Sequence, residues 1–383
     1  MKKLITNIFI LLFLIYPDSG IASDTLRVAI IGDYGSGARS AVGDVANLVK
    51  SWNPDLIITT GDNNYEDGLA LTIDHNIGQY YHDYISPYLG SYGAGADINR
   101  FFPSLGNHDY RCTICPQPYL DYFTLPNNER YYDFKWGPVH FFSISSDGKE
   151  PDGNNSSSVQ ALWLKTTMSE STQPLKIVYM HHPPFSSSSH GSTAIMQWPF
   201  KEWGADAVIA GHDHVYERII SDGLPYFVNG LGGKSIYQFY SIVSGSEVRY
   251  RGDYGAMLVE ITNEVALYKF INRSGELIDS YQYIIVDVEP ERAGIPAEFV
   301  LSQNYPNPFN PETIIRYSIP QEEEVSLVVY NLIGEKVALL INGNMPAGNH
   351  RVTWDASDVA SGVYFYRLQA GEFVQTRKMV LLK

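Results

Sequence analysis

Short apolar runs in the first part of the chain each end in a cluster of glycine, acidic, amide or histidine residues. The runs are Leu26–Ile31, Asp55–Thr60, Arg100–Leu105, Leu175–Met180 and Ala205–Ala210. The clusters that follow them are Gly32–Gly35, Gly61–Tyr65, Gly106–Asp109, His181–His182 and Gly211–His214. In an open α/β sheet the carboxyl ends of the strands converge on one crevice. The pattern therefore predicts one polar site built from distant segments.

The stretches between these runs favour an α/β fold. Between the first two runs, Ser40–Trp52 places Val42, Val45 and Val49 at helical spacing, which predicts a βαβ unit. Runs rich in valine and isoleucine on both faces indicate strands that are buried between layers. We expect this α/β domain to occupy residues 23–286.

The pattern changes after a predicted linker at residues 287–298, which contains Pro290 and Pro296. Short strands separated by turns follow it. They are expected at Ser326–Tyr330, Lys336–Ile341, His350–Trp354, Val363–Leu368 and Thr376–Leu382. Such spacing is typical of an all-β, immunoglobulin-like sandwich, here predicted for residues 299–383.

The first residues and the net charge bear on where the chain acts. Lys2 and Lys3, the apolar run Ile8–Tyr16 and the small residues near Ala22 have the three parts of a secretory signal peptide, predicted at residues 1–22. That apolar run is shorter than the roughly 20 residues needed to cross a bilayer, and we expect no transmembrane segment in the mature chain. A net charge of −15 argues against nucleic-acid partners. An anionic substrate would need local attraction from bound cations.

The chain contains two cysteines, Cys112 and Cys115. In an exported protein they can close a small disulfide loop, whereas a zinc site would need further ligands and a redox motif is less expected. The sequence leaves a disulfide and two free thiols equally open.

The polar clusters consist of residue types that bind metal ions. Carboxylate and amide oxygens suit hard cations, imidazoles suit zinc, iron or manganese, and one carboxylate can bridge two ions. His212 and His214 lie two positions apart, so in an extended segment they point to opposite sides and are expected to serve one ion each. The clusters together predict a two-metal site of the kind that activates water and binds phosphoryl oxygens.

The ordered blocks GDYG, GDNNY, GNHD, VYMH and GHDH resemble the signature of the calcineurin-like metallophosphoesterases. The block that contains Tyr65 resembles the purple acid phosphatases, and the length resembles the short, tartrate-resistant type. The resemblance implies a β-sandwich core flanked by helices. It also implies a secreted acid phosphatase that hydrolyses phosphate monoesters by attack of a metal-bound hydroxide on phosphorus.

Residue by residue, the resemblance implies a dinuclear centre with Fe(III) and a divalent ion that is iron, zinc or manganese. The implied Fe(III) ligands are Asp33, Asp62, Tyr65 and His214. The implied ligands of the divalent ion are Asp62, Asn107, His181 and His212, so Asp62 bridges the two ions.

Three further histidines receive roles from the same resemblance. His108 matches a histidine that contacts the phosphate, and His190 matches one that protonates the leaving group. The alternative for His190 is a solvated loop histidine. His182 falls at a variable position and is expected to be a supporting or structural residue.

Two other functions remain open at this point. A phosphodiesterase or nucleotidase of the same superfamily would share the ligand set and differ in the walls of the pocket. A non-catalytic surface protein on a phosphatase scaffold belongs to another class, and the intact set of metal-ligand residues speaks against it.

The C-terminal part resembles a type IX secretion sorting domain. The resemblance is carried by the run Leu301–Pro311 and by the segments Val329–Gly334 and Ser361–Phe365. It implies interaction with the type IX machinery and export through the periplasm of a Gram-negative bacterium to the medium or the cell surface. A carbohydrate-binding or adhesive sandwich is the structural alternative.

Overall fold

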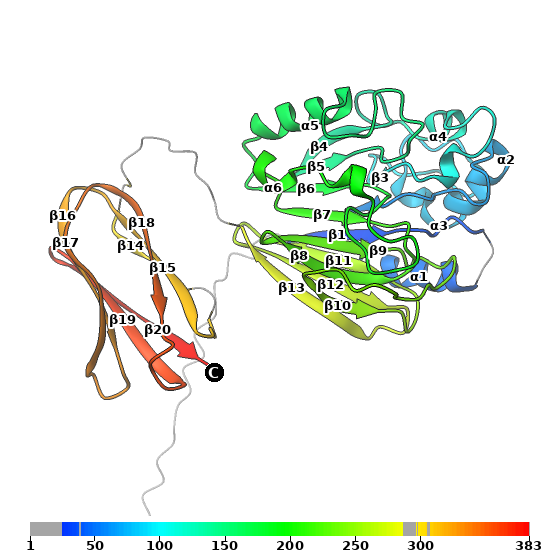
Figure 1. Cartoon of the computed structure of the whole chain (residues 1–383). Coiled ribbons are helices and arrows are strands. Elements are labelled where there is room, and N and C mark those ends of the chain that lie inside the picture. Colours follow the sequence, from blue (N-terminus) through cyan, green and yellow to red (C-terminus); the bar gives the residue numbers. More distant parts are fainter. Residues whose placement is uncertain (1–24, 38–39, 286–295, 297, 305–306, 383) are drawn as a thin grey trace, which may run out of the picture. The chain divides into compact units, whose positions relative to one another are not determined.

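The computed structural model describes residues 25–37, 40–285, 296, 298–304 and 307–382. The chain divides into two compact units, with the division between Val288 and Glu289. The predicted signal peptide at residues 1–22 lies outside the described residues, as does most of the predicted linker at 287–298. Each unit is described here by itself (Figure 1).

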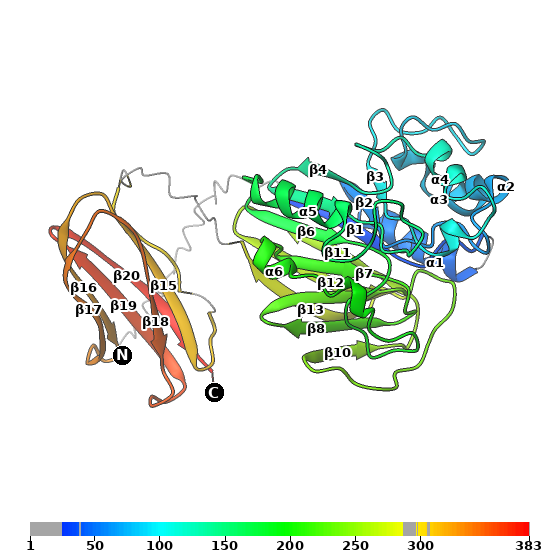
Figure 2. The same ribbon diagram turned by 45° about the horizontal axis from the view of Figure 1, so that its top comes forward.

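The first unit contains two sheets (Figures 1 and 2). One has the strand order β13 (Leu277–Ile284), β12 (Val265–Asn272), β11 (Gly255–Ile261), β1 (Leu26–Ile31), β2 (Leu56–Thr59) and β3 (Phe101–Pro103). The other has the order β10 (Ser246–Tyr250), β8 (Tyr216–Ser221), β9 (Leu224–Asn229), β7 (Ala207–Ala210), β6 (Leu175–Tyr179), β5 (Val139–Ser143) and β4 (Tyr132–Trp136). All five predicted runs form strands, each at or within its expected bounds.

The two sheets pack face to face over a shared core. Ile30 and Ile58 of the first sheet and Tyr179 and Ile209 of the second belong to one cluster of buried side chains. Within the sheets, β1 is parallel to β2, β2 to β3, and β6 to β7. The carboxyl ends of these strands therefore lie at the same edge of each sheet, which is where the polar clusters follow.

Helices cover the outer faces of the sandwich. They are α1 (Ser40–Ser51), α2 (Ala70–Ile73), α3 (Gln79–Tyr81), α4 (Gln117–Tyr122), α5 (Val159–Ser169) and α6 (Phe200–Trp203), with short 3-10 or π turns at Asp74–Gly78, His82–Tyr84, His108–Tyr110 and Ala194–Met196. The helix α1 buries Val42, Val45 and Val49 as its spacing predicts. Leu164 of α5 and Phe200 of α6 join a second buried cluster behind β6 and β7. The expected α/β sandwich flanked by helices is confirmed.

The second unit contains two antiparallel sheets. One has the order β14 (Val300–Leu301), β15 (Glu312–Ile319) and β18 (Gly348–Asp355), and the other β17 (Lys336–Met345), β16 (Glu323–Tyr330), β19 (Gly362–Ala370) and β20 (Phe373–Leu381). Ile315 of one sheet and Leu327 and Tyr366 of the other share a core. The expected all-β sandwich is present, although the sequence analysis did not identify β14 or β15.

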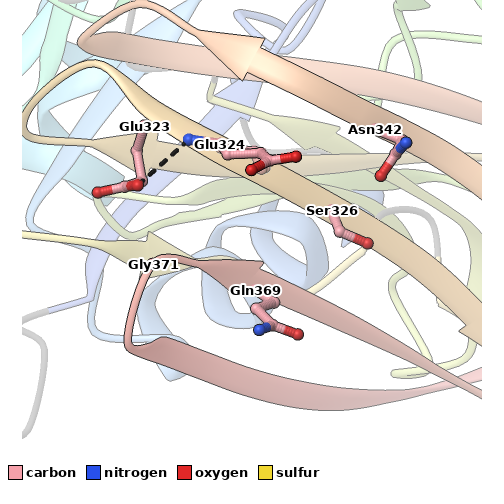
Figure 3. Close-up of a pocket in the computed structure, with 7 residues that line it drawn as sticks. Glu323, Glu324, Ser326, Asn342, Gln369 and Gly371 are labelled. Carbon is pink, nitrogen blue, oxygen red and sulfur yellow. Dashed lines mark hydrogen bonds between the residues drawn. The ribbon is translucent and has the colours of Figure 1, made fainter.

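The second unit buries part of the run Leu301–Pro311 and has a polar hollow on its surface. Phe309, in the run Leu301–Pro311, is buried, and its backbone N–H donates to Val380 of the last strand at 3.0 Å. A polar hollow lies on the sheet of β16, β17 and β19 and is lined by Glu323, Glu324, Asn342 and Gln369 (Figure 3). No cationic side chain lies among the residues that line it.

Candidate metal centre

The polar clusters lie where the sequence places them, directly after the strands of the two sheets. Asp33 follows β1, Asp62 follows β2 and Asn107 follows β3, while His181 follows β6 and His212 follows β7. Because the parallel strands end at common edges and the sheets share a core, segments far apart in sequence meet in one site.

The turns that carry these side chains have unusual backbone conformations. Asp33, Asp62 and His212 have φ angles of 56°, 53° and 67°, in the left-handed region that non-glycine residues rarely adopt. Neighbouring glycines allow the turns to touch. A Cβ atom on Gly106 would lie 2.1 Å from the backbone nitrogen of Asp62. Strained backbone held by close packing is typical of functional sites.

Three buried side chains form the first group of candidate ligands, which we call the oxygen-rich cluster: Asp33, Tyr65 and His214. The Tyr65 hydroxyl donates to Asp33 Oδ1 at 3.1 Å and lies 3.3 Å from His214 Nε2. His214 Nε2 lies 3.2 Å from the same carboxylate oxygen. The three ligand atoms are thus mutual neighbours, and no side chain of the cluster is more than 5% exposed.

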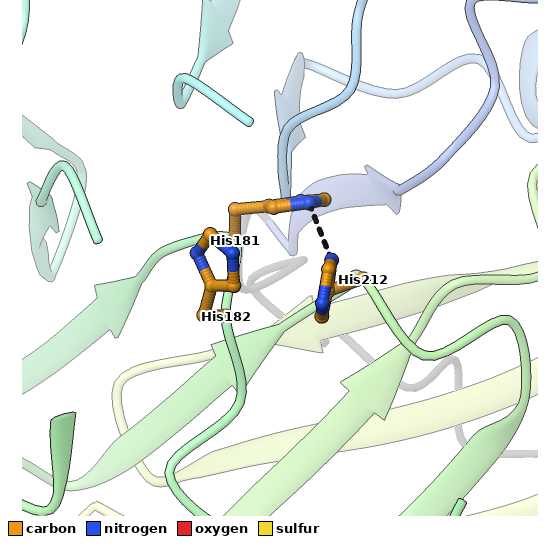
Figure 4. Close-up of side chains that lie close together, drawn as sticks. All are labelled: His181, His182 and His212. Carbon is orange, nitrogen blue, oxygen red and sulfur yellow. Dashed lines mark hydrogen bonds between the residues drawn. The ribbon is translucent and has the colours of Figure 1, made fainter. Parts of the chain in front are cut away.

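A second group, the nitrogen-rich cluster, consists of Asn107, His181 and His212. His181 Nε2 lies 2.9 Å from Asn107 Oδ1 and 3.1 Å from His212 Nδ1. Figure 4 shows the two imidazoles meeting edge to face, with His182 beside them. Asn107 and His212 are partly exposed, so this cluster is open to solvent on one side.

Asp62 connects the two clusters. Its Oδ1 lies 3.4 Å from His181 Nε2, and one ligand atom from each of Asp62, His181 and Asp33 of the oxygen-rich cluster lies within 4.8 Å of the others. The backbone N–H of His108 donates to Asp62 Oδ1 at 2.9 Å, which fixes the carboxylate in the turn. A single carboxylate in contact with both groups has the placement of a bridging ligand.

The chemistry of these atoms fits bound cations. His181 Nδ1 lies 2.8 Å from the carbonyl oxygen of Thr60 and therefore carries the ring proton, which leaves a lone pair on Nε2. That lone pair faces oxygens of Asn107 and Asp62, so acceptor atoms converge on one point. A cation at such a point satisfies all of them.

Burial sets the protonation of the candidate ligands. It is the main cause that raises the pKa of the Asp33 and Asp62 carboxyls, because ionised carboxylates lose hydration there. It likewise raises the pKa of the Tyr65 phenol, which a nearby cation would counter. Burial lowers the pKa of His212 to about 2 and that of His214 to about 4. Both imidazoles are therefore neutral in mildly acidic solution.

The three other predicted histidines lie around the nitrogen-rich cluster. His108 Nδ1 is 2.6 Å from the carbonyl oxygen of Glu66, and its Nε2 is 3.9 Å from Asp62 Oδ2. The exposed ring of His190 stacks on His212 with centroids 4.2 Å apart. The ring of His182 lies 4.4 Å from that of His212, and its Nδ1 contacts the Ser146 hydroxyl at 2.9 Å.

The side chains that support the clusters could not be recognised in the sequence. Ser235 Oγ lies 2.5 Å from His214 Nδ1, and the Tyr237 ring stacks on His214 at 4.1 Å. The backbone N–H of His190 donates to buried Asp213 at 2.9 Å, which places its loop beside the site. The available signal for Asp213 was its position between two candidate ligands. Ser235 and Tyr237 carried no comparable signal.

Cys112 and Cys115 form a disulfide, with an S–S distance of 2.11 Å. Of the two states that the sequence left open, the structure has the bonded one. Cys115 Sγ packs 3.4 Å from the carbonyl oxygen of Gly68, in the segment that follows Tyr65. The small loop therefore braces one wall of the site.

Comparisons with known proteins define the class to which the two units belong. Residues 26–216 match the family described as calcineurin-like phosphoesterase, and residues 303–382 match the secretion system C-terminal sorting domain. The chain thus contains a calcineurin-like phosphoesterase domain followed by a sorting domain of type IX secretion.

Within that class, the chain is a distant homologue of the purple acid phosphatases. It is 26% identical to purple acid phosphatase 17 of Arabidopsis thaliana over 244 residues, which cover 54% of this chain and 68% of that protein. It is 24% identical to tartrate-resistant acid phosphatase type 5 of Mus musculus over 243 residues, 54% of this chain and 72% of the relative.

Two solved structures share the fold of the first unit. The purple acid phosphatase PPD1 from yellow lupin (Lupinus luteus) seeds has a TM-score of 0.56 at 19% identity, covering 68% of this chain and 54% of that one. GAP50, the anchor in the inner membrane complex of Plasmodium, has a TM-score of 0.52 at 20% identity, and the match covers 68% of this chain and 89% of that one. At these identities the likeness shows the fold alone.

Proposed function

We propose that the first unit is a dinuclear metal-dependent acid phosphatase that hydrolyses phosphate monoesters. The observation that carries the proposal is the Asp62 carboxylate, which lies next to Asp33 of the oxygen-rich cluster and His181 of the nitrogen-rich cluster. The homology to purple acid phosphatases supports the same reaction.

In this proposal Asp33, Tyr65 and His214 hold Fe(III), and Asn107, His181 and His212 hold a divalent ion, with Asp62 shared. A bound metal pair lowers the pKa of water and offsets the negative charge of a phosphoryl group. The oxygen-rich cluster suits a trivalent ion because it contains two anionic oxygen donors, a carboxylate and a phenolate.

The remaining chemistry falls to two histidines. The Glu66 carbonyl accepts from His108 Nδ1–H, so Nε2, on the side of Asp62, donates to a phosphate oxygen when the ring is in its protonated, imidazolium form. His190, exposed and stacked on His212, is placed to give a proton to the leaving oxygen. Each acts by position, because His108 is held by its backbone contacts and His190 by the hydrogen bond of its own N–H to Asp213.

The proposal is tested by comparing an aryl phosphate with a bis-aryl phosphate as substrates of the metal-loaded protein. We expect faster hydrolysis of the monoester and a large loss of this activity in His108→Ala. The matched control is His75→Ala, since His75 is exposed and hydrogen-bonds to Tyr92. Preferred hydrolysis of the diester would instead support the phosphodiesterase alternative.

We further propose that residues 23–286 form the catalytic domain, residues 287–298 the linker and residues 299–383 an address for export to the medium or the cell surface. The match to the sorting-domain family supports this assignment. Among the described residues, no helix has the length and apolar character needed to cross a bilayer.

A chain that ends at Pro290 tests this division, because every candidate ligand precedes that residue. We expect unchanged aryl phosphatase activity in vitro and loss of export in a host with type IX secretion. A folded but inactive truncated protein would show that the C-terminal unit contributes to the site.

A further inference from the structure

The segment Gly230–Ser235 follows β9 and runs across the turns that carry the candidate metal ligands. The backbone N–H of Gly232 donates to Gly32 at 2.9 Å, and that of Lys234 donates to the carbonyl oxygen of Asp33 at 3.2 Å. Ser235 Oγ contacts His214 Nδ1 at 2.5 Å. The position of Lys234 is therefore fixed by the same turns that form the oxygen-rich cluster.

The side chain of Lys234 extends over the site. Its ammonium lies 4.3 Å from the centre of the Tyr65 ring and forms an ion pair with Glu66. The Tyr65 hydroxyl belongs to the oxygen-rich cluster, so the ammonium lies one aromatic ring away from the candidate ligand atoms. The other neighbour of that ring is His108, with centroids 4.3 Å apart.

The Lys234–Glu66 pair is well placed to exchange partners. The Glu66 side chain is 60% exposed, whereas that of Lys234 is 14% exposed. Because the Glu66 carboxylate lies on the solvent side of the pair and keeps water as an alternative partner, an incoming anion can replace it. The Lys234 ammonium does not have to move far for this exchange, because it already lies over the Tyr65 ring at the site.

A second cation lies nearby. Arg111 is exposed and directly follows the 3-10 turn His108–Tyr110. The Lys234 hydrogen bond chiefly lowers the pKa of Glu66, and the charge of Arg111 adds to this effect. Lys234 and Arg111 thus both act on the Glu66 carboxylate, on a chain whose net charge is −15.

We propose that Lys234 forms a second anion-binding position next to the phosphate site and selects phosphomonoesters whose leaving group carries another anionic group. The inference rests on the proposed phosphatase function and narrows its substrate class. Glu66 occupies the position when no such substrate is bound.

The test uses two non-hydrolysable probes on the metal-loaded full chain, propylphosphonate and propane-1,3-diphosphonate, with binding measured by calorimetry. Lys234→Met should lower the affinity for the diphosphonate about fivefold, as expected for the loss of one nearby charge. It should change the affinity for the monophosphonate by less than about twofold. Glu66→Gln should tighten the diphosphonate without affecting the monophosphonate. Lys234→Arg should retain the preference.

A matched control is Lys50→Met, since Lys50 forms an exposed ion pair with Asp83 at 3.0 Å in the last turn of α1. It should change neither probe. The inference would be overturned if Lys234→Met lowered the affinity for both probes equally. It would also be overturned if neither Lys234→Met nor Glu66→Gln changed the affinity for the diphosphonate. Aryl phosphatase activity of the same wild-type preparation reports separately on the proposed function.

Discussion

The two ligand clusters differ in donor type and in access to solvent. Asp33, Tyr65 and His214 are almost completely buried and supply two oxygens and one nitrogen, whereas Asn107 and His212 of the nitrogen-rich cluster are partly exposed. Tyr237 stacks on His214 and Lys234 covers Tyr65, so the oxygen-rich cluster is closed from outside. In the proposed dinuclear centre, this difference favours a permanently bound ion in the oxygen-rich cluster and a substrate-facing ion in the nitrogen-rich cluster, with Asp62 shared between them.

The largest effect is expected when the shared carboxylate is removed. Asp62→Ala should lower the metal content at both positions and reduce aryl phosphate turnover by about a thousandfold or more, because several kcal/mol of transition-state stabilisation depend on the metal pair. Metal analysis and steady-state kinetics measure both effects.

The control for that variant is Asp222→Ala. Asp222 has a φ of 51°, close to the 53° of Asp62, and lies in an exposed turn away from the clusters. It imposes the same backbone strain without removing a ligand. An Asp62→Ala protein that keeps two ions and near-normal turnover would show that Asp62 is not a ligand shared by the two clusters.

A smaller and selective effect is expected at the nitrogen-rich cluster. His212→Ala should lower the affinity for the divalent ion by about a hundredfold. Iron should stay bound, since the ligands of the oxygen-rich cluster stay intact. His190→Ala is the control, because its ring stacks on His212 but His190 is not a predicted ligand. Loss of iron from His212→Ala would show that the clusters are not separate ion sites.

Tyr65→Phe tests the metal-binding role of the oxygen-rich cluster, because it removes the hydroxyl and keeps the buried ring. A phenolate on Fe(III) gives a charge-transfer band, so the oxidised wild-type protein should be violet to purple and the variant should lose this colour. We expect turnover to fall by about tenfold. Tyr237→Phe should keep the colour, although its ring also contacts His214. A colourless, active, iron-loaded wild-type protein would exclude the phenolate ligand.

The smallest expected effect is that of mild acid. Burial lowers the pKa of His212 to about 2 and of His214 to about 4, so both imidazoles stay neutral above these values and remain able to bind cations. Burial raises the pKa of the Asp33 and Asp62 carboxyls instead, so acid should release both ions by protonating these two ligands before it protonates either imidazole. Metal content after dialysis at each pH tests this, and retention of both ions until the pH falls below about 4, where His214 is protonated, would contradict it.

The sequence predicted the fold and the position of the candidate ligands at the strand ends, because both depend on local order. Each strand that precedes a polar cluster is a short, mostly apolar run, and each candidate ligand follows such a run within a few residues, as Asp33 follows β1. Parallel pairing then brings the strand ends together without any further information. The strand β15 was missed because it comes directly after the proline-rich run, whose turn residues dominated the interpretation of that region.

The supporting contacts could not be predicted in the same way. Ser235 and Lys234 reach the site because the segment after β9 turns back over β1, a contact between residues distant in sequence. Their segment, Gly230–Ser235, resembles a phosphate-binding loop in composition but lacks the required glycine at Val228. Long-range packing, rather than a local pattern, gives these residues their positions.

The central claim is that two metal ions share Asp62. The most direct measurement is the metal content of the purified mature protein after expression with iron and with zinc or manganese, determined on the sample used for the aryl phosphate assay. The account predicts two ions per chain, one of them iron, together with hydrolysis of the aryl phosphate. A folded protein that binds no metal under these conditions would contradict it.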